Sequence, residues 1–312
     1  MVRICIMGGC GHFHTAVKPD VEIAGVCLTG QETPGFSFLV NRFGKAPVFE
    51  NYEQMINECK PDLAVIDGFF GSHAEMAAYA LKQGINVYCE KPIAINKEQF
   101  LLLEDVYKES NAQFASMLTS RYEPCFYTMY HEIKKGTIGQ IKLINAQKSY
   151  IFGMRPPFYN NKEEYGNTFM WVGIHPVDLI LWFTGEKIRN SHYFSSGKNS
   201  FGFNELSDCA VAVLEMENGV LATVTVDFLR DEDADSHGDD RIRVVGDEGT
   251  LEVRDEKLFL LKDGEITECE MLSPPDVFYD FIENLDDKSK RTADDKDAFN
   301  STKAVINITS KH

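Results

Sequence analysis

The sequence predicts an α/β protein, with an N-terminal doubly wound parallel sheet followed by a C-terminal α+β domain that has an open, mostly antiparallel sheet. Three observations predict this fold. Short β-rich runs alternate with helical signals over the first 120 residues, a glycine-rich turn follows the first run, and longer β-type segments follow residue 121. A chain of 312 residues suggests about two domains, which we place at residues 1–120 and 121–312.

The first domain is expected to contain parallel strands joined by helices. Its β-rich runs cover residues 4–7, 21–28, 63–66, 87–89 and 114–118. Ser72 and Glu75 form a capping-box pattern at the start of one helix, which Gly84 ends. Asn96 and Gln99 start the next helix. Such alternation indicates crossover helices on both faces of the sheet.

The second domain is expected to be dominated by its sheet. A helix from about residue 123 to 135 ends at Gly136. The β-type segments then cover residues 141–151, 209–216, 220–229, 241–245, 250–253 and 258–261, with turn signals between several of them. An apolar helical segment at about 169–183 interrupts them, and the chain becomes helical again from about residue 276.

Composition excludes several classes of partner. Lys and Arg number 31 against 48 Asp and Glu, which gives a net charge of −17. Such acidity argues against nucleic acid and against anionic membranes, because both need clustered cations. No apolar run reaches the roughly 18 residues of a membrane span, and the apolar stretch at residues 2–7 is too short for a signal peptide. We therefore expect a cytoplasmic protein.

No metal site is expected. The eight cysteines are scattered without a C-x-x-C pair, so they are interpreted as buried thiols in a reducing compartment. The acidic run at 231–240 superficially resembles a calcium loop. It has Ser236 where an EF-hand needs glycine and Ile242 where it needs glutamate, so a solvated loop is expected.

The glycine turn after the first run is typical of dinucleotide binding. Gly9 permits a tight bend, and Gly11 lets backbone amides approach a pyrophosphate, which the start of the following helix would stabilise. His12, Phe13 and His14 complete the turn, with His14 in the third glycine position. Any tight strand-to-helix turn uses glycine, so the motif alone is weak.

The end of the second run lacks the rest of that fingerprint. An acid about 20 residues on usually holds the ribose of NAD, and an arginine the 2′-phosphate of NADP. The run ends instead at Thr29 and Gly30. The choice between NAD and NADP therefore stays open, and so does weakened or absent cofactor binding.

Several motifs in order carry a resemblance that covers nearly the whole chain. They are Ser72-His73-Ala74-Glu75, Cys89-Glu90-Lys91-Pro92, Arg121-Tyr122-Glu123-Pro124, Gly173-Ile174-His175-Pro176-Val177-Asp178 and Gly246-Asp247-Glu248-Gly249-Thr250-Leu251. Together they resemble the Gfo/Idh/MocA family, that of glucose–fructose oxidoreductase and inositol dehydrogenase. The resemblance implies a Rossmann domain, a second domain whose sheet often mediates oligomers, and hydride transfer between NAD or NADP and a hydroxyl carbon of a small sugar-like substrate.

The resemblance also implies roles for single residues. Cofactor-binding candidates are Gly9, Gly11, His12, Phe13, His14, Thr29, His73, Glu90 and Lys91. Lys91 would hydrogen-bond the reacting hydroxyl, or else simply pair with Glu90. His175 would be the general base, with Asp178 orienting it or binding a substrate hydroxyl. The alternative for His175 is a buried histidine with an ordinary hydrogen-bond partner.

One position departs from the family. Many active members carry an aspartate four residues before the histidine, where this chain has Trp171. An indole cannot replace a carboxylate, but it can form a wall for a sugar or a nicotinamide ring. Arg121, Arg155, Tyr165 and Trp171 are the candidate substrate contacts. For the first three, a solvated loop or an interdomain ion pair is about equally expected.

Three functions are compatible with these patterns. The first is an NAD(P)-dependent oxidoreductase that acts on a sugar, a polyol or a related hydroxyl compound. The second is a non-catalytic relative that senses a nucleotide or a sugar, which His14, Thr29 and Trp171 would favour. The third is a cofactor-assisted eliminase or hydrolase without net redox change.

Overall fold

The chain folds into two compact units. The computed structural model describes residues 1–33, 36, 46–198, 200–203 and 206–310. Unit 1 comprises residues 1–117, 154–166 and 277–303, and unit 2 comprises 118–153, 167–276 and 304–312. The two later segments of unit 1 come from the part of the chain that we had assigned to the second domain.

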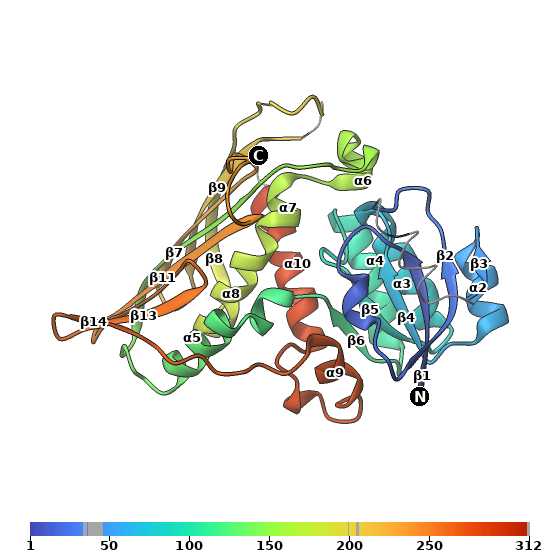
Figure 1. The fold of residues 1–312 in the computed structure, drawn as a ribbon, viewed down its shortest axis with the longest axis horizontal. Coiled ribbons are helices and arrows are strands. Elements are labelled where there is room, and N and C mark those ends of the chain that lie inside the picture. Colours follow the sequence, from blue (N-terminus) through green and yellow to red (C-terminus); the bar gives the residue numbers. More distant parts are fainter. Residues whose placement is uncertain (34–35, 37–45, 199, 204–205, 311–312) are drawn as a thin grey trace. The chain divides into compact units, whose positions relative to one another are not determined.

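Unit 1 is built on the expected parallel sheet (Figure 1). Its strands are β1 (Val2–Gly8), β2 (Val21–Cys27), β3 (Val48–Phe49), β4 (Leu63–Asp67), β5 (Asn86–Cys89) and β6 (Phe114–Ser116). Their order is β3-β2-β1-β4-β5-β6, and every pairing is parallel. The doubly wound fold class is therefore confirmed, and strands β1 and β4 lie next to each other at its centre.

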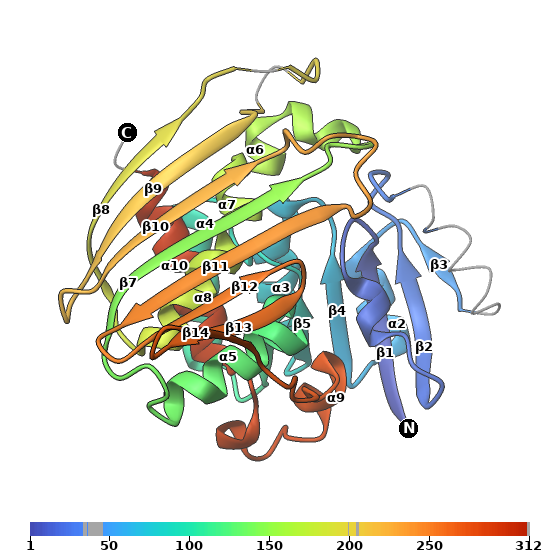
Figure 2. The same ribbon diagram turned by 60° about the vertical axis from the view of Figure 1, so that its left-hand side comes forward.

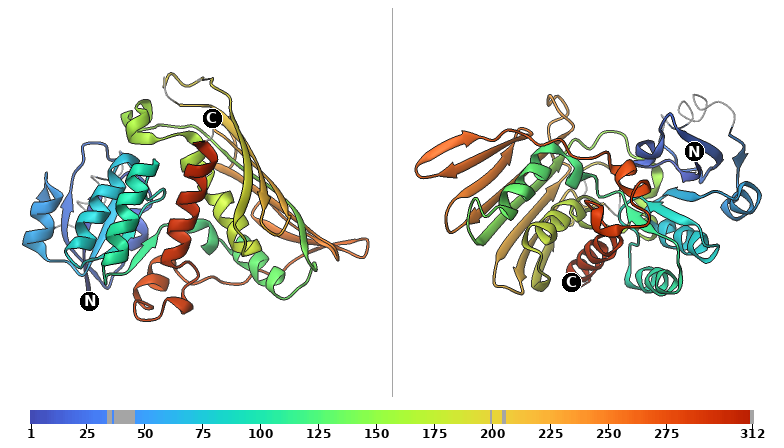
Figure 3. Two further views of the ribbon diagram at one scale, coloured as in Figure 1. Left: turned by 180° about the vertical axis from the view of Figure 1, so that it is seen from behind. Right: turned by 90° about the horizontal axis from the view of Figure 1, so that it is seen from below.

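Three α-helices of unit 1 pack beside its sheet. They are α2 (Tyr52–Cys59), α3 (His73–Lys82) and α4 (Lys97–Glu109), which lie side by side and are coloured blue to blue-green in Figure 3. Asn51 and Asn96 cap α2 and α4 by accepting hydrogen bonds from backbone amides. The capping box expected at Ser72 does not form, because its hydroxyl donates instead to the carbonyl of Phe69.

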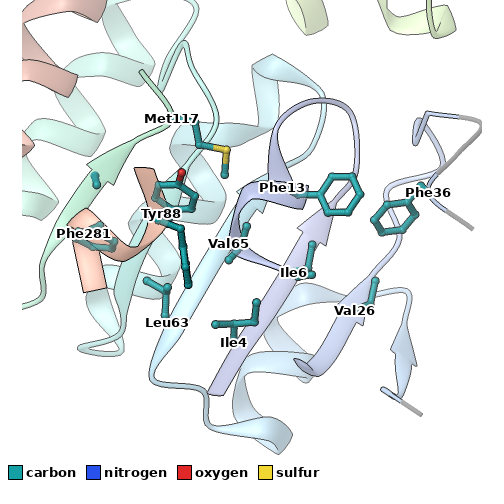
Figure 4. Close-up of a cluster of buried hydrophobic side chains, with 13 residues drawn as sticks. Ile4, Ile6, Phe13, Val26, Phe36, Leu63, Val65, Tyr88, Met117 and Phe281 are labelled. Atoms are coloured by element: carbon teal, nitrogen blue, oxygen red, sulfur yellow. The ribbon is translucent and has the colours of Figure 1, made fainter. Parts of the chain in front are cut away.

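The first crossover corrects a prediction. Only residues 9–20 join β1 to β2, and they form a single 3₁₀ helix, η1 (Phe13–Ala16), in place of the expected α-helix. Helix α9 (Val277–Ile282) adds cover to the same apolar face. Figure 4 shows Tyr88 and Phe281 in this cluster of buried side chains, and their rings stack with centroids 5.9 Å apart.

The other short elements of unit 1 lie in its loops and in its two later segments. They are η2 (Phe70–Ser72), η4 (Pro157–Asn160), α6 (Lys162–Tyr165) and η5 (Lys288–Lys290). Helix α10 (Asp295–Thr309) begins in unit 1 and ends in unit 2. Segment 154–166 packs on η2, since Phe70 contacts the rings of Phe158, Tyr159 and Tyr165.

Unit 2 contains the expected open sheet, which is broad and strongly twisted (Figure 2). Its strands are β7 (Ile141–Tyr150), β8 (Ile188–Ser195), β9 (Cys209–Met216), β10 (Leu221–Asp227), β11 (Gly238–Gly246), β12 (Thr250–Arg254), β13 (Lys257–Lys262) and β14 (Glu265–Glu268). The order is β14-β13-β12-β11-β7-β10-β9-β8. Only β7 and β10 pair in parallel, so the mostly antiparallel sheet is confirmed.

Helices cover one face of that sheet. They are α5 (Pro124–Lys134), α7 (Thr168–Val172) and α8 (Ile174–Thr184), and the 3₁₀ helix η3 (Thr119–Tyr122) precedes α5. The acidic run predicted as a loop ends inside β11, which begins at Gly238. Among the described helices, none combines the length and apolar character that a membrane crossing requires.

Candidate active site

The glycine turn after β1 is tightly enclosed by other side chains of unit 1. A Cβ added to Gly9 would lie 1.9 Å from the ring of Phe36, and one added to Gly11 would lie 2.6 Å from Glu90 Oε2. Real Cβ atoms do not approach other atoms so closely. A side chain at Gly9 would therefore force the Phe36 ring to move, and one at Gly11 would force the Glu90 carboxylate to move, so glycine suits both positions.

The backbone amides of this turn already have acceptors. The amide of Phe13 donates to Asp67 Oδ2 at 2.9 Å, and that of His12 donates to Glu90 Oε2 at 2.8 Å. The ring atom Nδ1 of His12 lies 2.6 Å from the same Glu90 oxygen. Two carboxylates, from the ends of β4 and β5, thus occupy the donors that a phosphate would use at such a turn. Asp67 was missed by the sequence interpretation, although it ends a buried strand.

The two carboxyl groups are in opposite protonation environments. Burial, and then the charge of Glu90, raise the pKa of Asp67 well above its usual value. Burial would also raise the pKa of Glu90, but His12 and Lys91 together hold it below its usual range. The Lys91 amine is 2% exposed and lies 3.8 Å from Glu90 Oε1. This end of the sheet therefore gathers three ionisable side chains away from water.

The end of β2 holds an acid that the sequence interpretation did not find. Glu32 folds back so that its carboxylate accepts from the Thr29 hydroxyl at 2.7 Å and from the Gly30 amide at 3.1 Å. It also accepts from the Thr29 amide. A carboxylate thus lies where the ribose acid of the fingerprint was expected. The signal for it was a glutamate three residues after the strand-end threonine.

His73 and His14 occupy contrasting places. His73 is fully buried, with Nδ1 2.8 Å from the carbonyl of Pro92 and Nε2 2.9 Å from that of Gly68. Its ring therefore ties the end of β4 to the turn after β5. His14 is exposed on η1.

Two of the candidate substrate contacts, Tyr165 and Arg155, belong to unit 1. Tyr165 is fully buried among aromatic rings, and Arg155 lies 5.6 Å from the centroid of the Tyr159 ring.

In unit 2, Arg121 and Asp178 form a buried ion pair. Guanidinium Nε donates to Asp178 Oδ2, and Nη2 donates to Oδ1, both at 2.8 Å. The side chains are 1% and 2% exposed. The guanidinium also lies 5.0 Å from the centroid of the Trp182 ring. Both oxygens of Asp178 are therefore engaged by Arg121, which fixes η3 against α8.

His175 has a different partner. Its Nδ1 lies 3.2 Å from the hydroxyl of Ser120, and the residue is 4% exposed. Pro176 follows it in the first turn of α8, where proline is tolerated without a kink. A recess of about 10 Å³, enough for one water, is lined by His175 and Ser120 together with Lys148 and Asp240. The imidazole is thus oriented by a hydroxyl.

An ion pair also borders the recess beside His175. Lys148 is 4% exposed and forms an ion pair with Asp240. Burial, opposed by the charge of Lys148, raises the pKa of Glu123 to about 7, and the nearby Ser120 hydroxyl acts in the lowering direction. The sequence interpretation missed all three residues, because they come from separate elements. Glu123 and His175 consequently share Ser120 as a neighbour.

Trp171 is half-buried at the end of α7. Its ring stacks near Phe228, with centroids 6.1 Å apart, and lies 6.4 Å from the ring of Tyr150. The position at which the family resemblance led us to expect an aspartate is therefore part of an aromatic wall within unit 2. Among the residues that the structure describes, no cluster of three or more metal-ligating side chains is present.

Comparison with known proteins assigns the family. Residues 3–117 match the oxidoreductase family with an NAD-binding Rossmann fold, and residues 126–252 match the GFO/IDH/MocA C-terminal domain. An inositol 2-dehydrogenase/D-chiro-inositol 3-dehydrogenase of Lactiplantibacillus plantarum is 26% identical over 78% of this chain and 68% of that protein. The D-glucoside 3-dehydrogenase of Escherichia coli is 23% identical over 66% of this chain and 60% of its own length.

The solved structures agree with that assignment. A presumed oxidoreductase from Thermotoga maritima has a TM-score of 0.94 and 31% identity, covering 99% of this chain and 97% of that one. The myo-inositol 2-dehydrogenase of Lactobacillus plantarum has a TM-score of 0.77 and 21% identity, over 99% and 96% of the chains. The chain belongs to the GFO/IDH/MocA family of oxidoreductases, whose N-terminal domain is an NAD-binding Rossmann fold.

Proposed function

We propose that the protein moves a hydride between NAD or NADP and a hydroxyl carbon of a sugar, polyol or related small molecule. The observation that carries this proposal is Lys91, a buried amine at the C-terminal end of β5. Ligands of open parallel sheets bind beyond the carboxyl ends of the strands. Support for the substrate class comes from the relatives, which include inositol and glucoside dehydrogenases.

The donors of unit 1 fit a dinucleotide in kind. The amides of His12 and Phe13 suit a pyrophosphate, and Glu32 at the end of β2 suits ribose hydroxyls. Glu90 and Asp67 also lie close to Gly11, so the glycine turn and these amides form one candidate site for the pyrophosphate. When bound, the cofactor supplies the carbon that accepts or donates the hydride. Gly9, Gly11, His14 and His73 shape this part of unit 1.

Lys91 and His175 carry the proposed proton chemistry. The Lys91 ammonium hydrogen-bonds the substrate oxygen and stabilises its developing negative charge. His175, held at Nδ1 by Ser120, accepts the hydroxyl proton at Nε2. Asp178, proposed from the motif as a catalytic partner, acts instead as a positioning residue through Arg121. Arg155, Tyr165 and Trp171 remain proposed substrate contacts.

Turnover measurements test these roles. Purified protein is offered inositols and glucosides with NAD and NADP, while the near-ultraviolet absorbance of reduced nicotinamide is followed. We expect His175→Asn and Lys91→Met to lower kcat by roughly 10²–10⁴-fold. Matched controls are the exposed His192→Asn and Lys97→Met, which should keep the parent rate. If the first two variants turn over as fast as the parent, the assignment is wrong.

A non-catalytic sensor is the second candidate. It is favoured by Trp171 in place of the carboxylate and by the occupied amides of the glycine turn. Dinucleotide binding measured by calorimetry, with no turnover of any polyol, would support the sensor. Turnover that depends on His175 would exclude it.

We further propose that copies of the chain associate through the sheet of unit 2, in the cytoplasm. Phe194, Val211, Val213 and Leu221 are exposed on the face that the helices leave uncovered. All eight cysteines are free thiols, which suits a reducing compartment. Light scattering of the purified protein tests the association, and Val213→Lys should reduce the measured mass to that of one chain.

A further inference from the structure

The glycine turn of unit 1 is already bound to carboxyl groups that belong to the protein. Asp67 and Glu90 accept from the amides of Phe13 and His12, and one oxygen of each lies within 3.0 Å of the point that a Gly11 Cβ would take. Asp67 Oδ1 has no hydrogen-bond partner among the described residues. A pyrophosphate that approaches these amides must replace the carboxylates or lie beside them.

We propose that Asp67 and Glu90 stand in for the cofactor pyrophosphate in the free protein, and that a dinucleotide binds at this turn with uptake of a proton by the pair. This inference rests on the proposed function for the identity of the ligand. It assigns Asp67 a role in cofactor affinity, although Asp67 lies outside the glycine motif.

The charge balance around the pair supports proton uptake. The titratable groups that face it are Cys10 and His12 from the turn, His14 from η1, Cys89 and Lys91 from β5 and its end, His73 from α3, and Tyr159 from η4. Of these, His12 and Lys91 both lower the pKa of Glu90. A pyrophosphate adds negative charge at the same point. Because water is largely excluded there, this charge is poorly screened.

The direction of the pH effect follows from linkage. Burial and the neighbouring Glu90 already raise the pKa of Asp67 in the free protein. An added anion raises the pKa of both carboxyl groups further, and loss of the His12 amide raises that of Glu90. Because these pKa values are higher in the complex, binding takes up protons. Affinity is therefore greatest at low pH and falls by up to about tenfold per pH unit for each proton.

Calorimetry of the intact protein with NAD and NADH tests the proposal. Titrations between about pH 6 and 9, in two buffers of different ionisation heat, count the protons directly. We expect uptake by the parent and weaker binding at high pH. Asp67→Asn keeps the side-chain shape without ionising, so it should flatten the pH dependence and bind more tightly at high pH. Glu90→Gln should bind more tightly throughout.

The control is Asp62→Asn, which removes an exposed acid just before the opposite end of β4 and should keep the parent pH dependence. Thermal melting shows that each variant is folded, and the proton count on the parent needs no variant. Affinity of the parent that is independent of pH without proton uptake would overturn the proposal, as would no binding by any variant. Proton-linked binding without turnover would leave it standing while removing the dehydrogenase assignment.

Discussion

The two units each bury a group of charged side chains, and the groups differ in how completely their acids are paired. In unit 2, both oxygens of Asp178 accept from one guanidinium. In unit 1, Asp67 and Glu90 converge on one turn, and Asp67 Oδ1 has no hydrogen-bond partner among the described residues. A closed pair fixes local structure, whereas an acid short of donors responds to whatever binds beside it. The buried acid of unit 2 thus fixes local structure, whereas the buried acids of unit 1 can respond to a ligand.

Breaking the closed pair is expected to have the largest effect. Arg121→Leu leaves Asp178 as an uncompensated buried charge, which costs about 3–5 kcal/mol of the free energy of unfolding. Urea denaturation measures this loss. The double variant with Asp178→Leu should recover much of it, because the orphaned charge is then removed as well.

An exposed pair provides the matched control. Arg189 and Glu215 form an ion pair on the sheet of unit 2, and the arginine side chain is 53% exposed. Arg189→Leu should cost less than about 1 kcal/mol. Equal losses from Arg121→Leu and Arg189→Leu would show that burial does not set the strength of the Arg121 pair.

The glycine turn of unit 1 gives an intermediate effect. The Cβ of Gly11→Ala would press on the oxygens of Glu90 and Asp67, so the turn must shift, at about 1–3 kcal/mol of unfolding free energy. Affinity for a dinucleotide should fall as the amides move. Gly249→Ala, whose nearest neighbour lies at 3.2 Å, is the milder comparison. A fully stable Gly11→Ala protein with parent affinity would contradict the enclosed turn.

Local patterns predicted much of the fold. Alternation of β-rich runs with helices placed β1, β4, β5 and β6, because period and turn residues are properties of neighbouring positions. The helix expected after Gly11 was wrong, since residues 9–20 are too few for an α-helix and a return to β2. Residues 277–282 add cover to the exposed apolar face, and that long-range packing has no local signature.

The candidate site divides in the same way. Lys91 and His175 were recognisable because each lies inside a contiguous motif. Asp67, Glu32 and Ser120 were not, since their importance depends on which distant backbone or ring they contact in the folded chain. For Asp178 we propose a positioning role in place of a catalytic one, because Arg121, 57 residues away in the sequence, donates to both of its oxygens.

The smallest expected effect tests whether Ser120 orients the imidazole of His175 or only supports the surrounding structure. Ser120→Ala removes the hydroxyl beside Nδ1, so the imidazole loses this hydrogen-bond partner, and the neighbouring Glu123 carboxyl loses a polar group that lowers its pKa. We expect kcat to fall by roughly tenfold, about 1.4 kcal/mol, with little change in KM, and the pH profile to shift. Ser116→Ala is the matched control, because this buried hydroxyl has no partner among the described residues. A raised KM with an unaltered pH profile would show that Ser120 shapes the substrate pocket and does not orient the base.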